Sequence, residues 1–315
     1  MSSGTVRRSS IFTDLTEEDL RAVFEDTDYV ADDDVVTTVL LALRLGKPLL
    51  IEGEPGSGKT ELGKVLATGF DTDLIRLQCY EGLTAENTLY EWNYTKQLLA
   101  VQAGEGGVTG EDASESVFDD EYLLERPLMR ALMHEGEYPP VLLIDEVDRA
   151  DEEFEALLLE VLSDFQVSVP ELGTITADQP PIVIITSNRT RGLSDALKRR
   201  CLYLHVEPPS FEKERTIVRR KVPAIDAAVA AELVGVTQRL REEPFLKQPG
   251  VAETLDWARA IAALREDNGA SLSTEEIRNT LGCLLKEVED IDRIDESFLN
   301  ELLEAAIEAR ETVEG

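Results

Sequence analysis

The feature that most constrains this chain is a glycine-rich turn directly after a short apolar run. Residues 49–60 read LLIEGEPGSGKT, and Gly53–Thr60 is the full G-x-x-x-x-G-K-[ST] pattern of a phosphate-binding loop. Glycine permits backbone conformations that a Cβ forbids, so N–H groups around Gly53, Gly56 and Gly58 can curl around an anion. An ordinary glycine turn is the alternative. The buried-strand run upstream favours the phosphate loop, because such a loop requires that context.

The residues of this loop are expected to bind the phosphates of a nucleotide. The helix that follows directs its positive end at the same place. Lys59 supplies a charge for the β- and γ-phosphates, and the Thr60 hydroxyl supplies a ligand for Mg²⁺. The expected binding residues are Gly53, Glu54, Pro55, Gly56, Ser57, Gly58, Lys59 and Thr60.

The charge balance is a second constraint. The chain of 315 residues has 64 Asp and Glu against 31 Lys and Arg, a formal net charge of −33. Such a surplus repels itself unless salt screens it. Because the acidic residues are spread along the whole chain, we interpret them as adaptation to a salt-rich cytoplasm, as in halophilic organisms. The charge also disfavours nucleic acid as the main partner, since binding phosphates needs Lys and Arg.

Cysteine spacing and hydropathy disfavour several other classes. Cys79, Cys201 and Cys283 are far apart and form no C-x-x-C pair, which argues against a disulfide framework or a zinc site. No apolar run approaches the length of a membrane span, and Met1–Ser10 lacks the apolar core of a signal peptide. We therefore expect a soluble cytoplasmic protein.

Strand and helix patterns alternate in the first part of the chain, which predicts an α/β fold: a parallel sheet of about five strands flanked by helices. Continuous apolar runs are typical of strands that are covered on both faces. Bound ligand is expected at the carboxyl ends of these strands. The predicted strands are the run 49–51 before the phosphate loop, Leu74–Gln78, Val141–Ile144, Ile182–Ile185 and Leu202–Val206.

From Ser210 onward only helix signals remain, which predicts a smaller all-helical lid domain. The expected divisions are an N-terminal lead-in at 1–30, the α/β nucleotide-binding domain at 31–207 and the lid at 208–315. Gly104–Asp120 is rich in glycine and acidic residues and is expected to be a mobile loop. The predicted lid helices are Phe211–Lys221, Asp226–Arg241, Thr254–Asp267, Ser273–Leu285 and Asp295–Arg310.

Polar residues at the ends of the predicted strands complete the expected site. Asp145 is placed to hold Mg²⁺ through water, and Glu146 to orient and deprotonate the attacking water. A solvated turn is the alternative interpretation of this pair. Asn188 ends the next strand and is a candidate to place the water or contact the γ-phosphate, although Asn is common in turns. Gln78 is a further candidate, to bridge to Glu146 and restrain it.

A basic cluster, Lys198-Arg199-Arg200, precedes the last predicted strand. In so acidic a chain, three consecutive basic residues are not expected on the surface without a function. We predict that one of the two arginines is aimed at phosphate.

Together, the phosphate loop, the Asp-Glu strand end, the following Asn, the Arg before the last strand and the helical lid resemble the AAA+ ATPases. Within them, Asp145–Ala150 (DEVDRA) resembles the D-E-[IV]-x-R-A signature of the MoxR-type branch. Tyr90–Tyr94 (YEWNY) and Asp256–Ala260 (DWARA) resemble segments of the CoxD-like members.

The resemblance implies ATP and Mg²⁺ as cofactors. It also implies a homo-hexameric ring, because an arginine finger acts on the nucleotide of a neighbouring subunit. The implied correspondences are Gly53–Thr60 to Walker A, Asp145 and Glu146 to Walker B, Asn188 to sensor 1, Arg200 (or its competitor Arg199) to the arginine finger, Arg259 to the sensor 2 arginine of the lid, and Arg149 to the signature arginine, expected at the subunit boundary.

Relatives of the MoxR type commonly work with a partner that carries a von Willebrand factor A domain, and assist maturation or metal-cofactor insertion in other proteins. CoxD-like members are linked to molybdenum hydroxylases. The resemblance thus implies a Mg-ATP-dependent ATPase that remodels a protein client. A nucleic-acid motor or loader is the alternative, disfavoured by the charge. A nucleotide-gated scaffold with little hydrolysis is a third hypothesis, disfavoured by the intact Glu146 and Arg200.

Overall fold

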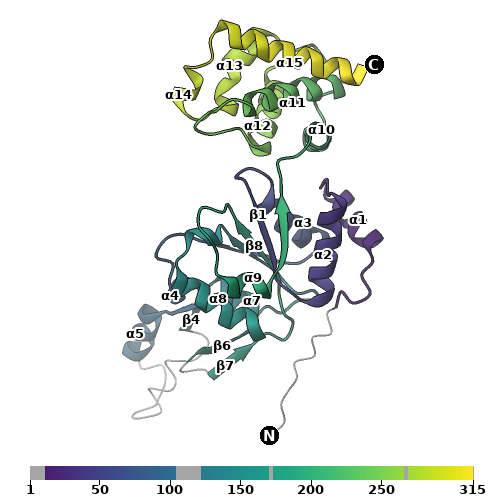
Figure 1. The fold of residues 1–315 in the computed structure, drawn as a ribbon. Coiled ribbons are helices and arrows are strands. Elements are labelled where there is room, and N and C mark those ends of the chain that lie inside the picture. The colour runs from purple at the N-terminus through teal and green to yellow at the C-terminus, as the bar shows by residue number, and fades with distance from the viewer. Residues whose placement is uncertain (1–10, 104–121, 170–172, 266–268, 315) are drawn as a thin grey trace. The chain divides into compact units, whose positions relative to one another are not determined.

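The computed structural model describes residues 11–103, 122–169, 173–265 and 269–314 (Figure 1). The predicted loop 104–120 lies outside these ranges. In the described part of the chain, no helix is both long enough and apolar enough to cross a membrane. The chain forms two compact units: the first comprises Met1–Val23, Asp32–Glu52 and Thr60–His205, and the second Phe24–Ala31, Gly53–Lys59 and Val206–Gly315.

A five-stranded parallel sheet, in the order β2-β5-β8-β1-β9, is the basis of the first unit. This confirms the predicted α/β fold with about five strands, each of them within two residues of its expected ends. Parallel register pairs Gln78 with Asp145 and Ile144 with Ile185, so the carboxyl ends of β2, β5 and β8 lie at one edge. The strands are β1 (Leu49–Gly53), β2 (Leu74–Gln78), β5 (Val141–Asp145), β8 (Ile182–Ser187) and β9 (Leu202–Val206).

Helices lie on both faces of the sheet (Figure 1). Alternate side chains of the strands pack under them. On one face, Leu142 and Ile185 belong to a core with α7 (Pro127–Leu132) and α8 (Glu152–Asp164). On the other, α3 (Lys59–Gly69) lies so close that a Cβ added to Gly63 would be 3.3 Å from the Leu143 side chain. Both faces of the central strands β5 and β8 are therefore covered, which explains why these two strands are continuous apolar runs until their ends.

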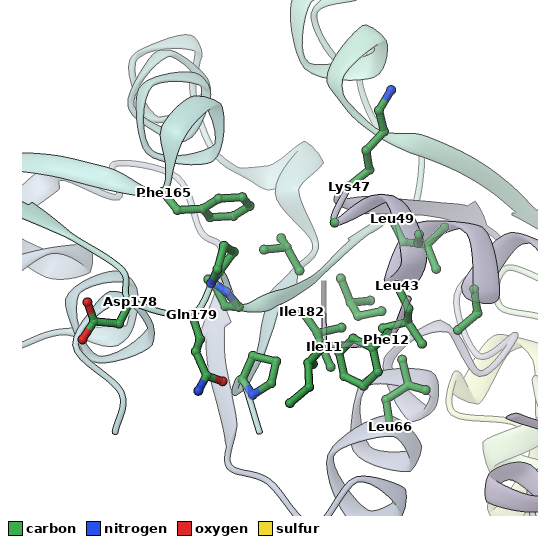
Figure 2. A pocket seen from close by; sticks show the side chains of 18 residues that line it. Ile11, Phe12, Leu43, Lys47, Leu49, Leu66, Phe165, Asp178, Gln179 and Ile182 are labelled. Atoms are coloured by element: carbon green, nitrogen blue, oxygen red, sulfur yellow. The ribbon is translucent and has the colours of Figure 1, made fainter. Parts of the chain in front are cut away.

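A cavity of about 340 Å³ opens at the edge of the sheet where the strands begin (Figure 2). Leu49 and Ile182, the first residues of β1 and β8, line it with Leu43 of α2 (Asp33–Leu45), Phe12 and Phe165. Its lining is mostly apolar. Because parallel strands present their catalytic residues at their carboxyl ends, this cavity is at the wrong edge of the sheet to be the expected nucleotide site.

Several short elements were not predicted from the sequence. The hairpin of β6 (Gln166–Val169) and β7 (Gly173–Thr176) is antiparallel, as is the pair β3 (Tyr90–Trp92) and β4 (Leu123–Glu125). Trp92 is buried, and its ring meets that of Tyr90 edge to face at 6.1 Å, so Trp92 packs internally, whereas Tyr94 is exposed. The other short elements that were not predicted are α4 (Ala85–Thr88), α5 (Tyr94–Ala103), η3 (Val147–Arg149), α9 (Asp195–Arg200) and α14 (Val288–Ile291). The short helix α1 (Glu17–Asp26), in contrast, follows a helix-start pattern at Thr16 and Asp19 that is visible in the sequence.

The second unit is largely helical, as predicted for the lid. Its core is one apolar cluster in which Trp257 is fully buried and donates from Nε1 to the Thr280 hydroxyl at 2.7 Å. Ser273 and Glu276 form a capping box at the start of its fourth long helix, α13. The helices are α10 (Phe211–Lys221), α11 (Ala227–Arg241), α12 (Val251–Leu264), α13 (Thr274–Leu284) and α15 (Glu296–Glu314).

Candidate nucleotide site

The phosphate loop has the backbone that its glycines predict. Gly56 and Gly58 have φ of +80° and +89°, a region that residues with a Cβ rarely adopt. Gly53 is needed for a different reason, since a Cβ there would lie 2.3 Å from the Val206 carbonyl oxygen. The Gly56 carbonyl accepts a hydrogen bond from the Val251 amide at 3.1 Å, so the loop contacts the first residue of α12.

Lys59 folds back over this loop. Its Nζ donates to the carbonyls of Gly53 at 3.0 Å and Glu54 at 2.6 Å, and the residue is buried. The ammonium group thus lies inside the curl of the loop, where an anion would be bound. The chain continues directly into Thr60, at the start of α3.

Asp145 lies at the end of β5 with its side chain almost wholly buried. The Thr60 and Thr186 hydroxyls donate to its Oδ1 at 3.0 and 2.5 Å. Hydroxyl and carboxylate oxygens are the ligands that Mg²⁺ prefers, directly or through water. Thr60 and Asp145 therefore fit a Mg²⁺ site of the kind that the phosphate-loop pattern predicts.

Glu146 has an unusual backbone for a residue with a side chain. Its φ of 56° and ψ of 51° are left-handed, which costs about 1–2 kcal/mol in a residue with a Cβ. Its carboxylate accepts hydrogen bonds from Gln78 at 3.1 Å, Arg149 at 2.9 Å and Asn188 at 3.3 Å. Strained backbone of this kind is concentrated at functional sites.

These contacts bring together several residues that sequence analysis singled out. Gln78 bridges to Glu146, as predicted. Asn188, at the end of the neighbouring strand β8, reaches the same carboxylate. Arg149, expected at a subunit boundary, pairs with Glu146 of its own chain while its side chain remains 61% exposed.

The loop after β8 is held in place by Asp148, a buried residue that sequence analysis did not single out. Its carboxylate accepts hydrogen bonds from the Asn188 backbone amide at 3.0 Å, and from the Thr190 backbone amide and hydroxyl at 2.9 and 2.6 Å. Burial alone would raise the pKa of Asp148, but these hydrogen bonds outweigh it and lower the pKa below its ordinary value. The charged form is therefore the one that positions Asn188.

Arg76 is the second functional candidate that sequence analysis missed. It lies on β2, two residues before Gln78, and its guanidinium pairs with Asp145 Oδ2 at 2.5 Å. A sequence signal was present. Arg76 and Gln78 are the polar positions of an otherwise apolar strand, and alternation places both on one face.

The remaining predicted residues make hydrogen bonds and ion pairs with residues outside this cluster, or are exposed. Arg200, on α9, donates from Nε to the Ser163 hydroxyl at 3.2 Å and from Nη1 to the Ala196 carbonyl at 3.4 Å. Arg199 is exposed. Arg259, on α12 of the second unit, pairs with Asp256 of the same helix at 2.9 Å.

Comparison with known families agrees with this geometry. Residues 48–201 match the family described as AAA domain (dynein-related subfamily). That segment contains the phosphate loop, the Asp145–Glu146 pair and Asn188. The α/β part of the chain thus has the AAA+ fold over the matched residues.

Relatives among characterised and uncharacterised proteins are distant. Staphylococcus haemolyticus SH1500 is 25% identical over 243 residues, which cover 75% of this chain and 83% of that protein. Escherichia coli YehL is 30% identical over 193 residues, covering 58% of this chain and 48% of YehL. The Holliday junction branch migration complex subunit RuvB of Thermotoga petrophila is 22% identical over 294 residues, covering 88% and 73% of the two chains.

Solved structures of Thermotoga maritima RuvB also resemble this chain. One, the Holliday junction branch migration motor, is 18% identical and covers 93% of this chain and 76% of its own, with a TM-score of 0.44. A mutant form of the same protein has a TM-score of 0.48 at 17% identity, covering 90% and 74%. At this level the likeness is too loose to assign a function.

Proposed function

We propose that this protein is a Mg-ATP-dependent AAA+ ATPase that remodels or matures a protein client, as MoxR-type proteins do. The observation that carries the proposal is the arrangement around Glu146. Its carboxylate is held by Gln78, Arg149 and Asn188 next to an Asp145–Thr60 pair suited to Mg²⁺. A nucleotide-binding scaffold would not need a positioned carboxylate at this place.

Each residue then has a chemical role. The phosphate loop and Lys59 bind and neutralise the phosphates, and Thr60 with Asp145 would hold Mg²⁺. When bound, Mg²⁺ stabilises charge that develops on the phosphate oxygens. Glu146 orients the attacking water and accepts its proton, while Asn188 keeps that carboxylate in position.

Completion of the site by a second copy of the chain is part of this proposal. Arg200 is proposed as the arginine finger, and its hydrogen bond to Ser163 supports it as an oriented side chain. Arg199, which is exposed like Arg200, is the alternative. Arg259 of α12 is proposed to contact the phosphates as sensor 2. A hexameric ring follows from the family logic of a finger that acts between subunits.

The client and partner are proposed from the motif resemblance. The DEVDRA sequence at 145–150 and the CoxD-like segments support a partner with a von Willebrand factor A domain and a client that receives a metal cofactor. A further relative, the denitrification regulatory protein NirQ of Stutzerimonas stutzeri, is 25% identical over 205 residues, covering 62% of this chain and 64% of NirQ.

A nucleic-acid motor is the second candidate function. It is favoured by the alignment to RuvB over 88% of this chain. The net charge of −33 opposes it, because phosphate binding requires basic surface.

An ATPase assay in high salt separates these candidates. We expect wild type to hydrolyse ATP, Glu146→Gln to bind it without turnover, and DNA to have no effect. Equal rates for the two proteins would contradict the hydrolysis proposal, whereas strong stimulation by DNA would favour the motor.

The finger is tested by mixing variants. Lys59→Ala lacks nucleotide binding but keeps both arginines, and Arg200→Ala keeps the nucleotide site. If Arg200 acts on a neighbour, the two inactive variants regain activity when mixed. Arg199→Ala in place of Arg200→Ala is the matched comparison, and activity restored only with Arg199→Ala would reassign the finger.

A further inference from the structure

Arg76 occupies a position at the candidate Mg²⁺ site that the proposed function does not explain. Its Nη2 and Nε donate to Asp145 Oδ2 at 2.5 and 3.2 Å. The Asp145 side chain is only 4% exposed, whereas that of Arg76 is 52% exposed. The carboxylate is thus fixed inside the protein, and its cationic partner reaches it from solvent.

Both oxygens of this carboxylate are engaged. Oδ1 accepts from the Thr60 and Thr186 hydroxyls, and Oδ2 accepts from the guanidinium. Two neutral donors do not offset a buried negative charge, so the guanidinium is the group that compensates it. The same carboxylate is the one proposed to hold Mg²⁺ through water. Because Oδ1 already accepts from two hydroxyls, the Arg76 guanidinium and a hydrated Mg²⁺ compete for Oδ2.

We propose that Arg76 is a built-in counter-cation of the Mg²⁺ site, which neutralises Asp145 in the absence of the metal and leaves Oδ2 when Mg²⁺ binds. The inference rests on the proposed Mg-ATP function. Because Arg76 is half exposed, its guanidinium can move into solvent while Asp145 stays in place. Arg76 thereby sets the Mg²⁺ concentration at which the site fills.

A second contact links this exchange to Glu146. Arg76 Nη2 also donates to Gln78 Oε1 at 2.8 Å, and Gln78 Nε2 donates to Glu146 at 3.1 Å. The amide of Gln78 is oriented by the guanidinium on one side and the carboxylate on the other. Departure of Arg76 removes one of these restraints, so filling of the metal site also changes how firmly Glu146 is held.

The size of the effect follows from competition. When the guanidinium must leave first, the apparent association constant for Mg²⁺ is the intrinsic constant multiplied by the fraction of molecules in which the guanidinium has already left. A half-exposed ion pair with one buried partner is worth more than a surface pair. We therefore expect Arg76→Gln to lower the half-saturating Mg²⁺ concentration about three- to tenfold.

The test measures Mg²⁺ binding without turnover. A fluorescent, non-hydrolysable ATP analogue is bound to the full chain in high salt, and Mg²⁺ is titrated from an EDTA-treated start. Wild type, Arg76→Gln and Arg149→Gln are compared, the last because Arg149 is a similarly exposed arginine (61% against 52%) that contacts Glu146 instead of Asp145. Arg76→Met, which keeps the side-chain stem, replaces Arg76→Gln if thermal melting shows that the latter is unfolded.

The proposal expects a lower half-saturating Mg²⁺ concentration in Arg76→Gln, a clearly smaller shift in Arg149→Gln, and unchanged analogue binding in EDTA. An unchanged or higher Mg²⁺ requirement in Arg76→Gln would overturn it, as would an equal shift in Arg149→Gln, which would assign the effect to net charge. If wild type binds the analogue with no dependence on Mg²⁺, the proposed function itself fails, an outcome separate from these.

Discussion

The left-handed backbone at Glu146 makes a prediction about stability that is independent of any ligand. Glu146→Ala and Glu146→Gly remove the same carboxylate and the same hydrogen bonds, and they differ by one Cβ. Relief of the left-handed conformation is worth about 1–2 kcal/mol in the glycine variant. The greater freedom of glycine in the unfolded chain offsets about 0.5–1 kcal/mol of this. We therefore expect Glu146→Gly to be more stable than Glu146→Ala by about 0.5–1 kcal/mol.

Hydrogen exchange measured by mass spectrometry is the suitable assay, because peptides from β5 and β8 report the first unit separately from the second. Glu160 provides the control. It is an exposed residue within α8, where glycine costs about 1 kcal/mol relative to alanine, so the order of the two variants should reverse. A Glu146→Ala protein as stable as Glu146→Gly, or more so, would refute the argument that the backbone there is strained.

Three further predictions concern charge. Asp148→Ala should destabilise the first unit by about 1–3 kcal/mol, because it leaves the part-buried backbone amides of Asn188 and Thr190 without an acceptor, and should lower kcat more than nucleotide affinity; urea unfolding and steady-state kinetics check this. The Arg265 guanidinium lowers the pKa of Glu276 from 4.5 to about 2, so its contribution to stability is complete above pH 4.5 and is lost as pH falls toward 2. Its loss should amount to at most about 3 kcal/mol, less because the side chain is 32% exposed, and Glu276→Gln should abolish this pH dependence in acid unfolding of the second unit. Raising KCl from about 0.1 M to 1 M, which shortens the Debye length from about 10 to 3 Å, should raise the melting temperature, and a flat or falling response would contradict adaptation to salt.

The elements that could be predicted were those with one dominant periodicity. The sequence pattern places α10 at Phe211–Lys221, where the structure has it, because its apolar stripe and its Ser210 cap agree. The β6–β7 hairpin was missed, although Val167 and Val169 alternate with polar residues and are buried. A run of four residues is too short for its period to be told from a loop.

The candidate site was predictable as far as strand ends are concerned. Parallel strands end at one edge, which is enough to expect Asp145, Glu146 and Asn188 near one another. The contact between Arg76 and Asp145 depends on the register of β2 against β5, which no local pattern specifies. The left-handed φ of Glu146 could not be predicted from the sequence either, because the surrounding structure imposes such strain and the residue type does not indicate it.

The contact between the phosphate loop and α12 has a mechanical consequence. The Gly56 carbonyl accepts a hydrogen bond from the amide of Val251, the first residue of the helix. A Cβ on Gly250 would lie 2.8 Å from the Gly56 Cα, so the two backbones are in direct contact. No compressible side chain separates them. The helix has 14 residues and is about 21 Å long, and the loop contacts it at its N-terminal end. A shift of the loop would therefore act on the first residue of the helix that carries Arg259, about 12 Å further along its axis.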